Sequence, residues 1–159
     1  MNIQLAEADD INQLKMIFYK MGSLGIFEQG RFVLAGVKGS IENGEVFVIK
    51  DGNIITAFVE FHKRRDGAMV IRHIWTAVPR RGEGRAIRLI AAAYRATGAE
   101  SIEASCAEGA KNNTFYERYK LEDYVETQSS KARLRKYILD AGKIQREAAK
   151  YDAAERENV

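Results

Sequence analysis

The chain has 159 residues, of which 46% are hydrophobic and 30% charged, a composition typical of one soluble globular domain and unlike disordered or collagen-like chains. The net charge of +3 and the pI near 9.0 suit an anionic ligand, but 25 basic residues face 22 acidic ones, so the charge alone does not indicate nucleic-acid binding. One cysteine excludes an internal disulfide and gives no basis for a metal site, and no segment resembles a signal peptide or a membrane span, so we expect a cytoplasmic protein without a metal.

The first elements in chain order are a short strand and a helix. Ile3 and Leu5 alternate with polar residues, which favours a strand. Apolar residues then recur at helical spacing up to Gly22, a natural stop: Ile11, Leu14, Met16, Ile17 and Phe18. Four glycines in residues 23–44 predict a short helix between flexible joints.

A β-hairpin follows, because two β-branched runs in residues 45–61 flank Asp51-Gly52, a dipeptide typical of tight turns. Residues 68–78 predict a further strand and residues 84–97 a helix closed by Gly98. The remaining predicted elements are a strand in 101–105, a helix in 110–119 and two strands in 123–138.

This order of elements predicts an α/β fold: a single-domain mixed, mostly antiparallel sheet flanked by helices. We expect the domain to cover residues 1–139. Residues 140–159 are charged and rich in alanine, and they predict a C-terminal surface helix that frays or an arm that reaches a neighbouring subunit.

The stretch PRRGEGRAIRLI, residues 79–90, indicates a phosphate site. Free N–H groups at a helix start attract anions, and Gly82 and Gly84 let the backbone approach a ligand. Arg80, Arg81 and Arg85 add positive charge nearby.

Two common phosphate motifs fit this stretch poorly. A Walker A loop is excluded because no Lys-Ser or Lys-Thr follows the glycines. A dinucleotide fingerprint fits in part, since Gly82 and Gly84 supply G-x-G and Glu103 lies about 20 residues on. Ile87 occupies the place of the third glycine, however, and the stretch follows hairpin strands.

Residues 81–86 read R-x-x-G-x-A, which resembles the pyrophosphate loop of the GCN5-related N-acetyltransferases (the GNAT superfamily). The segment FYERYKLEDY at 115–124 resembles that family's later FYEKLGFE segment, and the predicted element order is similar to the family's up to about residue 139. The resemblance implies an acyl-CoA N-acyltransferase fold and direct transfer of an acyl group from acetyl-CoA, or another acyl-CoA, to an amine.

The resemblance also implies which residues hold the coenzyme. The pantetheine arm would lie between the strands in 71–78 and 101–105, on the backbone of Trp75, Thr76, Ala77 and Val78. The pyrophosphate would lie on the loop amides of Arg81, Gly82, Glu83, Gly84, Arg85 and Ala86. The family usually carries an asparagine seven residues before its tyrosine; Gly109 stands there in this chain, and Asn112 or Asn113 would take its role.

Tyr116 matches the family's tyrosine that protonates the departing thiolate. Its neighbours Phe115 and Tyr119 also fit a purely structural role in a core. Candidates for the general base are Glu60, His62 and His73, of which we favour Glu60; the resemblance also leaves open a water relay, which the family often uses instead. His73 alternates with apolar residues on a strand, as core histidines do, and His62 adjoins a basic run, as exposed ones do.

The acceptor amine is not specified by the sequence. Basic clusters at 63–65 and 131–136 leave open an acceptor that is a nucleotide or a modified base of a nucleic acid, although solvated surface charge is the simpler explanation of both clusters. A non-catalytic module that binds coenzyme A or nucleic acid is a further alternative, and a homodimer paired through the last strands and the charged C-terminal helix stays open.

Overall fold

Among the residues that the structure describes, seven strands form one sheet in the order β1-β2-β3-β4-β5-β7-β6. The computed structural model describes residues 1–21, 31–129 and 132–158, so the predicted stop at Gly22 and the glycines at 25 and 30 lie outside the described residues. The strands are β1 (Ile3–Leu5), β2 (Val46–Asp51), β3 (Ile54–Lys63), β4 (Ala68–Thr76), β5 (Ser101–Ala107), β6 (Val125–Gln128) and β7 (Arg133–Leu139). Of the pairings between these described strands, β4–β5 is parallel and the others are antiparallel.

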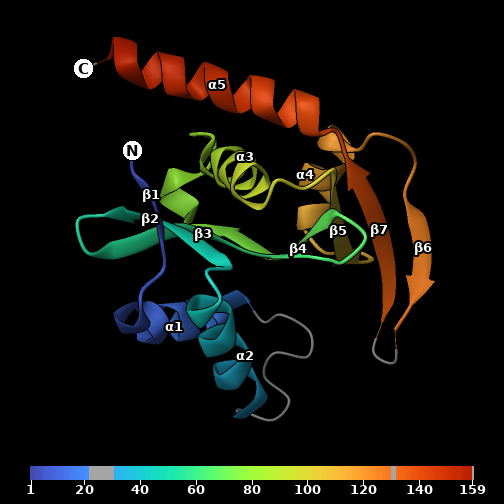
Figure 1. The fold of residues 1–159 in the computed structure, drawn as a ribbon, viewed down its shortest axis with the longest axis horizontal. Coiled ribbons are helices and arrows are strands. Elements are labelled where there is room, and N and C mark those ends of the chain that lie inside the picture. The colour runs from blue at the N-terminus through green and yellow to red at the C-terminus, as the bar shows by residue number, and fades with distance from the viewer. Residues whose placement is uncertain (22–30, 130–131, 159) are drawn as a thin grey trace.

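In the described part of the chain, five α-helices cover the two faces of the sheet (Figure 1). They are α1 (Ile11–Met21), α2 (Arg31–Glu42), α3 (Arg85–Thr97), α4 (Asn112–Tyr119) and α5 (Ala141–Glu157). Helices α1 and α2 lie on one face, whereas α3, α4 and α5 lie on the other. The predicted mixed, mostly antiparallel sheet flanked by helices is therefore confirmed.

The turn of the β2–β3 hairpin lies one residue later than the sequence suggests. Asp51 is the last residue of β2 and pairs with Ile54, so the turn consists of Gly52 and Asn53. Gly52 has a φ of 61°, a left-handed conformation that glycine adopts without a steric cost.

Two hydrophobic clusters hold the helices on the sheet. On the α1–α2 face, Leu14 and Phe18 pack with Val48 and Phe58; Met16, expected on the apolar side of α1, is exposed. The larger cluster joins the sheet to α3, α4 and α5, and its buried members include Ile71, Ile90, Ile102, Tyr137 and Ile144.

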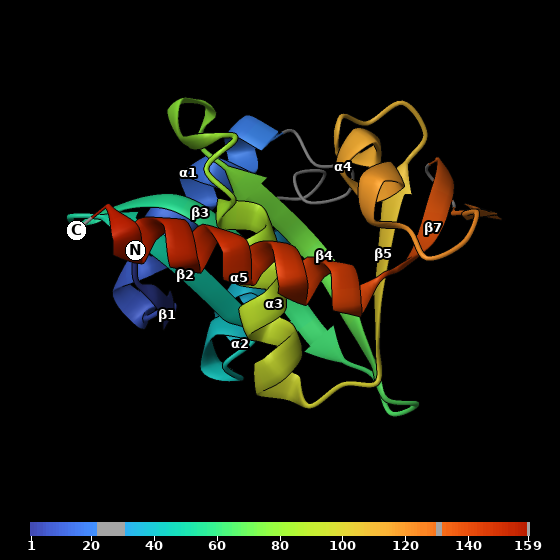
Figure 2. The same cartoon turned by 90° about the horizontal axis from the view of Figure 1, so that it is seen from above.

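Helix α5 crosses over α3, so that α3 lies between the sheet and α5 (Figure 2). Ile144 and Ala148 of α5 are buried in the larger cluster. Arg88 of α3 is buried beneath α5 and forms ion pairs with Asp152 at 2.7 Å and with Glu155 at 2.5 Å. The charged C-terminal segment thus packs along its own chain as a helix up to Glu157.

Candidate functional site

The sheet opens between β4 and β5. Their parallel pairing runs from Ala68 opposite Ser101 to Ile71 opposite Ala104 and ends there. Beyond that point β4 remains paired with β3, and β5 remains paired with β7. Two neighbouring strands therefore part while each stays held on its outer side, which leaves a wedge-shaped gap in the sheet.

A β-bulge in β4 marks the point of separation. Glu60 of β3 pairs with His73, but the next residue, Phe61, pairs with Ile71, so Arg72 is an extra residue in β4. An extra residue bends its strand and increases the local twist. Because the last β4–β5 pair is at Ile71, we attribute the parting of the two strands to this bulge.

The predicted phosphate loop follows β4 after a short 3₁₀ turn over Val78–Arg80. Gly82 and Gly84 have φ values of 81° and 74°, and Gly84 is the residue before the first helical residue of α3. Within the described part of the chain, the amides of residues 82–84 donate to no acceptor. With the first amides of α3 they form a cluster of free N–H groups at the positive end of the helix dipole.

Of the three arginines expected to add charge to this loop, two are paired with carboxylates. Arg85 is buried and contacts Asp51 at 3.1 Å and Glu83 at 3.0 Å; it also donates to the Thr56 hydroxyl. Its guanidinium thus anchors the loop to β2 and β3.

Arg80 is paired as well, with Asp51 at 2.8 Å and Glu83 at 3.5 Å. The Arg85 hydrogen bond, aided by Arg80, holds the pKa of the Asp51 carboxyl below its usual value. Arg81 is exposed, and its Nε donates to the Thr76 carbonyl at 3.3 Å, which leaves it as the loop arginine without a carboxylate partner among the described residues.

The predicted pantetheine-binding segment lies at the open end of β4. Trp75 and Thr76 are the last residues of β4, paired with Phe58 and Ala57 of β3. The Trp75 ring packs towards the α1–α2 face beside Phe58. Ala77 donates its amide to the Thr56 carbonyl at 2.8 Å.

Other predicted coenzyme residues divide between exposed and packed positions. Val78 is exposed, and Ala86 in the first turn of α3 packs against the core. Asn113 is buried: its amide donates to the Ala107 carbonyl, and its Oδ1 accepts from Tyr137. Asn112, at the start of α4, is exposed, so it is the member of the pair whose side chain is free to meet a ligand.

Tyr116 lies on the buried side of α4, 3% exposed, with its ring 5.5 Å from that of Tyr137. Burial, with Cys106 and Tyr137 nearby, raises the pKa of the phenol far above its usual value. Its hydroxyl makes no hydrogen bond within the described chain, and this oxygen is not fully buried. Cys106 of β5 is buried, and burial raises the pKa of its thiol.

The three candidates for a general base have different surroundings. Glu60 is buried, and its carboxylate contacts Nδ1 of His73 at 2.7 Å and accepts from the Ser40 hydroxyl at 2.6 Å. Burial alone raises the pKa of Glu60, but the hydrogen bonds from His73 and Ser40 outweigh it and bring the pKa below the usual value. His62 is more exposed and lies 3.3 Å from Glu45.

Three members of the basic clusters, Arg64, Arg135 and Lys136, have acidic partners. Arg64 binds Asp66 and Glu103, and Lys136 lies 3.6 Å from Glu103. Arg135 lies over the Tyr124 ring, 4.5 Å from its centre. Lys131 lies outside the described residues.

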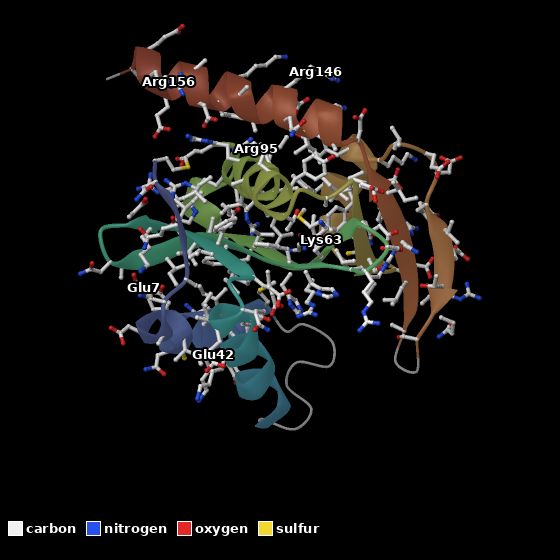
Figure 3. All side chains as sticks on the ribbon, viewed as in Figure 1. Glu7, Glu42, Lys63, Arg95, Arg146 and Arg156 are labelled. Carbon is white, nitrogen blue, oxygen red and sulfur yellow. The ribbon has the colours of Figure 1, made fainter. Side chains whose placement is uncertain are left out.

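Two residues that shape the site were not anticipated. Asp51, predicted only as part of a turn, holds both Arg80 and Arg85. Tyr151 of α5 lies against Gly84, so that α5 contacts the loop itself. Figure 3 shows side chains filling the layer between α5 and α3.

In residues 1–21, 31–129 and 132–158 no three His, Cys, Asp or Glu side chains are grouped to hold a metal, and no helix has the length and apolar character to cross a membrane.

No family model and no curated protein matches the chain. Solved structures do resemble it. One is an acetyltransferase of the GNAT family from Bacillus cereus ATCC 10987, with 16% identity and a TM-score of 0.64 over 87% of this chain and 96% of that one. Another is a Salmonella typhimurium protein solved with its cofactor acetyl-CoA, with 13% identity and a TM-score of 0.65 over 89% and 94%.

A third is a ribosomal-protein-alanine N-acetyltransferase from Brucella melitensis, with 15% identity and a TM-score of 0.66 over 87% of this chain and 98% of that one. At these identities the likeness concerns the fold, and it extends over nearly the full length of the solved chains. The protein has the fold of the GCN5-related N-acetyltransferases.

Proposed function

We propose that the protein transfers an acyl group from acetyl-CoA, or another acyl-CoA, directly to an amine. The observation that carries the proposal is the gap between β4 and β5, which begins at the Arg72 bulge and leads to a loop of free amides at the start of α3. A coenzyme with an extended arm and a diphosphate suits this arrangement, because the strands offer unpaired backbone along the gap and the loop offers donors at its end.

The residues present fit the coenzyme as follows. The backbone of residues 75–78 would bind the pantetheine arm, and the amides of residues 81–86 would bind the pyrophosphate. Arg81 has no carboxylate partner in the described chain and would add a cation. Asn112 is exposed at the start of α4 and would give a further polar contact.

Two groups near the gap suit the proton transfers of this reaction. The amine nitrogen forms a bond to the thioester carbonyl carbon, the C–S bond breaks, the amine loses a proton and the thiolate gains one. The Glu60–His73 pair would accept the proton of the amine. Tyr116, whose pKa is raised by burial, stays protonated at neutral pH and would donate to the thiolate.

The acceptor remains a prediction at the level of an amine. The pairing of Arg64, Lys136 and Arg135 with acidic or aromatic partners gives no specific support for a nucleic-acid acceptor. Association into a homodimer, cytoplasmic location and the boundary at residue 139 likewise remain predictions.

The first test is thermal unfolding with acetyl-CoA beside coenzyme A, NAD and ATP. A ligand at 100 times its Kd adds about 2.7 kcal/mol of stability, which for a chain of this size raises Tm by roughly 2–4 °C per kcal/mol. We expect stabilisation by acetyl-CoA and coenzyme A and none by NAD. Absence of any shift with acetyl-CoA contradicts the proposal. Release of free thiol with a panel of amines then identifies the acceptor class.

A further inference from the structure

The contacts of Glu60 leave its carboxylate no free oxygen to serve as a base. Oε1 contacts Nδ1 of His73 at 2.7 Å, and Oε2 accepts from the Ser40 hydroxyl at 2.6 Å. The residue is 5% exposed. Because both oxygens are engaged and the residue is buried, this carboxylate offers an incoming amine little accessible surface.

His73, in contrast, has an accessible nitrogen. Its side chain is 26% exposed, and Nδ1 is the ring atom that contacts Glu60. Nε2 forms no hydrogen bond to the described residues, and it is not among the side-chain nitrogens sealed from solvent without a partner. Nε2 is therefore the basic atom of the pair that a substrate can approach.

Glu60 determines which ring nitrogen of His73 carries the proton. The pKa of Glu60 lies below its usual value, so the carboxylate is ionised at neutral pH and can only accept hydrogen bonds. Nδ1 must then donate to it, which leaves the lone pair on Nε2. The same division of roles orients the histidine of a Ser-His-Asp triad.

The bulge brings this histidine to the point where the sheet opens. His73 follows the extra residue Arg72, and the β4–β5 pairing ends one residue before that, at Ile71. Among the described residues, the groups that face His73 come from three elements besides its own strand: Glu60 from β3, Ser40 from α2 through Glu60, and the Phe18 ring from α1, 5.0 Å away and edge-on. On β4 itself Arg72 contacts Ser40 at 3.5 Å and is the neighbouring cation.

We infer that Nε2 of His73 is the atom that takes the proton from the acceptor amine, and that Glu60 is a positioning residue that acts through His73. The inference rests on the proposed acyl transfer and refines it. The amine nitrogen bonds to the thioester carbonyl carbon, its proton passes to Nε2, and the coenzyme leaves as a thiolate that Tyr116 protonates. His73 returns its proton to solvent before the next cycle, and Tyr116 regains one.

The protein has two histidines, which makes the assignment testable without knowing the acceptor. Two-bond ¹H–¹⁵N spectra of the wild-type chain at pH 7.5 report the tautomer of each ring, with His62→Gln used to assign the signals. We expect His73 to carry its proton on Nδ1, and Glu60→Gln to shift it towards the other tautomer. A protonated Nε2 in the wild-type chain overturns the inference, whether or not any variant folds.

Activity is measured with acetyl-CoA and the best amine of the panel, using His73→Gln, His73→Ala and the matched control His62→Gln. A general base contributes about 10²- to 10⁴-fold, so we expect kcat to fall by at least about 10²-fold in both His73 variants and to be unchanged in His62→Gln. Added imidazole should restore part of the rate in His73→Ala, and the acid limb of the pH profile should disappear in His73→Gln. Affinity for acetyl-CoA should not change.

A rate in His73→Gln within about threefold of wild type, or no imidazole rescue combined with an unchanged pH profile, overturns the inference. Failure of the wild-type chain to bind acetyl-CoA is a different result, because it contradicts the proposed function. The roles assigned to Glu60 and His73 are then tested by the tautomer measurement alone.

Discussion

The Tyr151 ring of α5 lies against Gly84, the residue that precedes the first turn of α3, and a Cβ added to Gly84 would overlap that ring. The last helix of the chain therefore contacts the loop that we assign to the coenzyme. Gly84 is restricted twice, by its φ of 74° and by the ring. Gly82, with a φ of 81°, has no atom within 4 Å of a Cβ added there.

The two glycines therefore form a matched pair. We expect Gly82→Ala to lower the free energy of unfolding by roughly 1–2 kcal/mol, the cost of a left-handed non-glycine residue. Gly84→Ala should cost more, because the Tyr151 ring must also move. Chemical denaturation of both variants, with and without Tyr151→Ala, measures this. The difference in the free energy of unfolding between Gly82→Ala and Gly84→Ala should be smaller in the Tyr151→Ala background. If this difference is unchanged, the Tyr151 ring does not restrict Gly84.

Arg81 and Arg80 are neighbours on the same loop with different partners. Arg80 is held by Asp51 and Glu83, whereas Arg81 has no carboxylate partner among the described residues. We expect Arg81→Ala to raise the Kd of acetyl-CoA by roughly tenfold at low salt, the effect of a charge-assisted hydrogen bond, and less at high salt. Titration calorimetry at two salt concentrations tests this. Arg80→Ala is the control, and an equal loss in both variants would contradict the assignment.

Tyr116 and Tyr119 offer two hydroxyls on one helix. The Tyr116 hydroxyl has no hydrogen bond to the described chain, whereas Tyr119 donates to Glu147 at 2.5 Å. We expect Tyr116→Phe to lower kcat by about 10²-fold or more while stability and acetyl-CoA affinity stay close to wild type. Because burial raises the pKa of Tyr116, the phenol of the wild-type chain should stay protonated in moderately alkaline buffer and remain able to act as the acid. Tyr119→Phe should instead lower stability and leave kcat close to wild type. An unchanged kcat in Tyr116→Phe would exclude Tyr116 as the acid.

Glu60 should also matter for stability. Glu60→Gln replaces a buried carboxylate that has two hydrogen bonds, so we expect the free energy of unfolding at pH 7 to fall by about 1–3 kcal/mol. Since the folded-state pKa of Glu60 is lowered, its contribution is complete above the unfolded-state value of about 4.3 and is lost as the pH falls through the folded value. The stability curves of wild type and variant should therefore converge in acid. Parallel curves would mean that the charge does not stabilise the fold.

Arg88 links α3 to α5 through Asp152 and Glu155. Arg88→Met keeps the aliphatic stem but removes the cation, so we expect faster amide exchange in residues 150–157 and a Tm lower by a few degrees. Arg95→Met, which changes an exposed arginine of the same helix, is the control.

Acid should loosen the same contact between α3 and α5. The amino terminus and Arg88 hold the pKa of Glu155 at about 2, so its contribution is complete above the usual carboxyl pKa and is lost as the pH falls towards 2. Amide exchange as slow in Arg88→Met as in wild type would show that packing alone holds α5.

The sequence by itself determined the order and approximate limits of the elements. Hydrophobic periodicity and glycine are local signals, so the helix closed at Gly98 and the β2–β3 hairpin could be predicted, the latter with its turn displaced by one residue. The loop motif in residues 81–86 and its resemblance to the GNAT superfamily were also local, and the fold that they implied is confirmed.

The tertiary structure alone decided how distant residues meet. The register that places Glu60 opposite His73 depends on an extra residue in β4, and no local pattern distinguishes a bulged strand from a regular one. The positive charge of the loop could be predicted from the sequence. Its neutralisation by Asp51 could not, because the contact between Asp51 and Arg85 joins residues 34 positions apart. The docking of α5 depends likewise on Arg88 of α3, whose partners lie on α5, and on Tyr151, which contacts Gly84 in the loop; long-range packing, not local propensity, fixes such contacts.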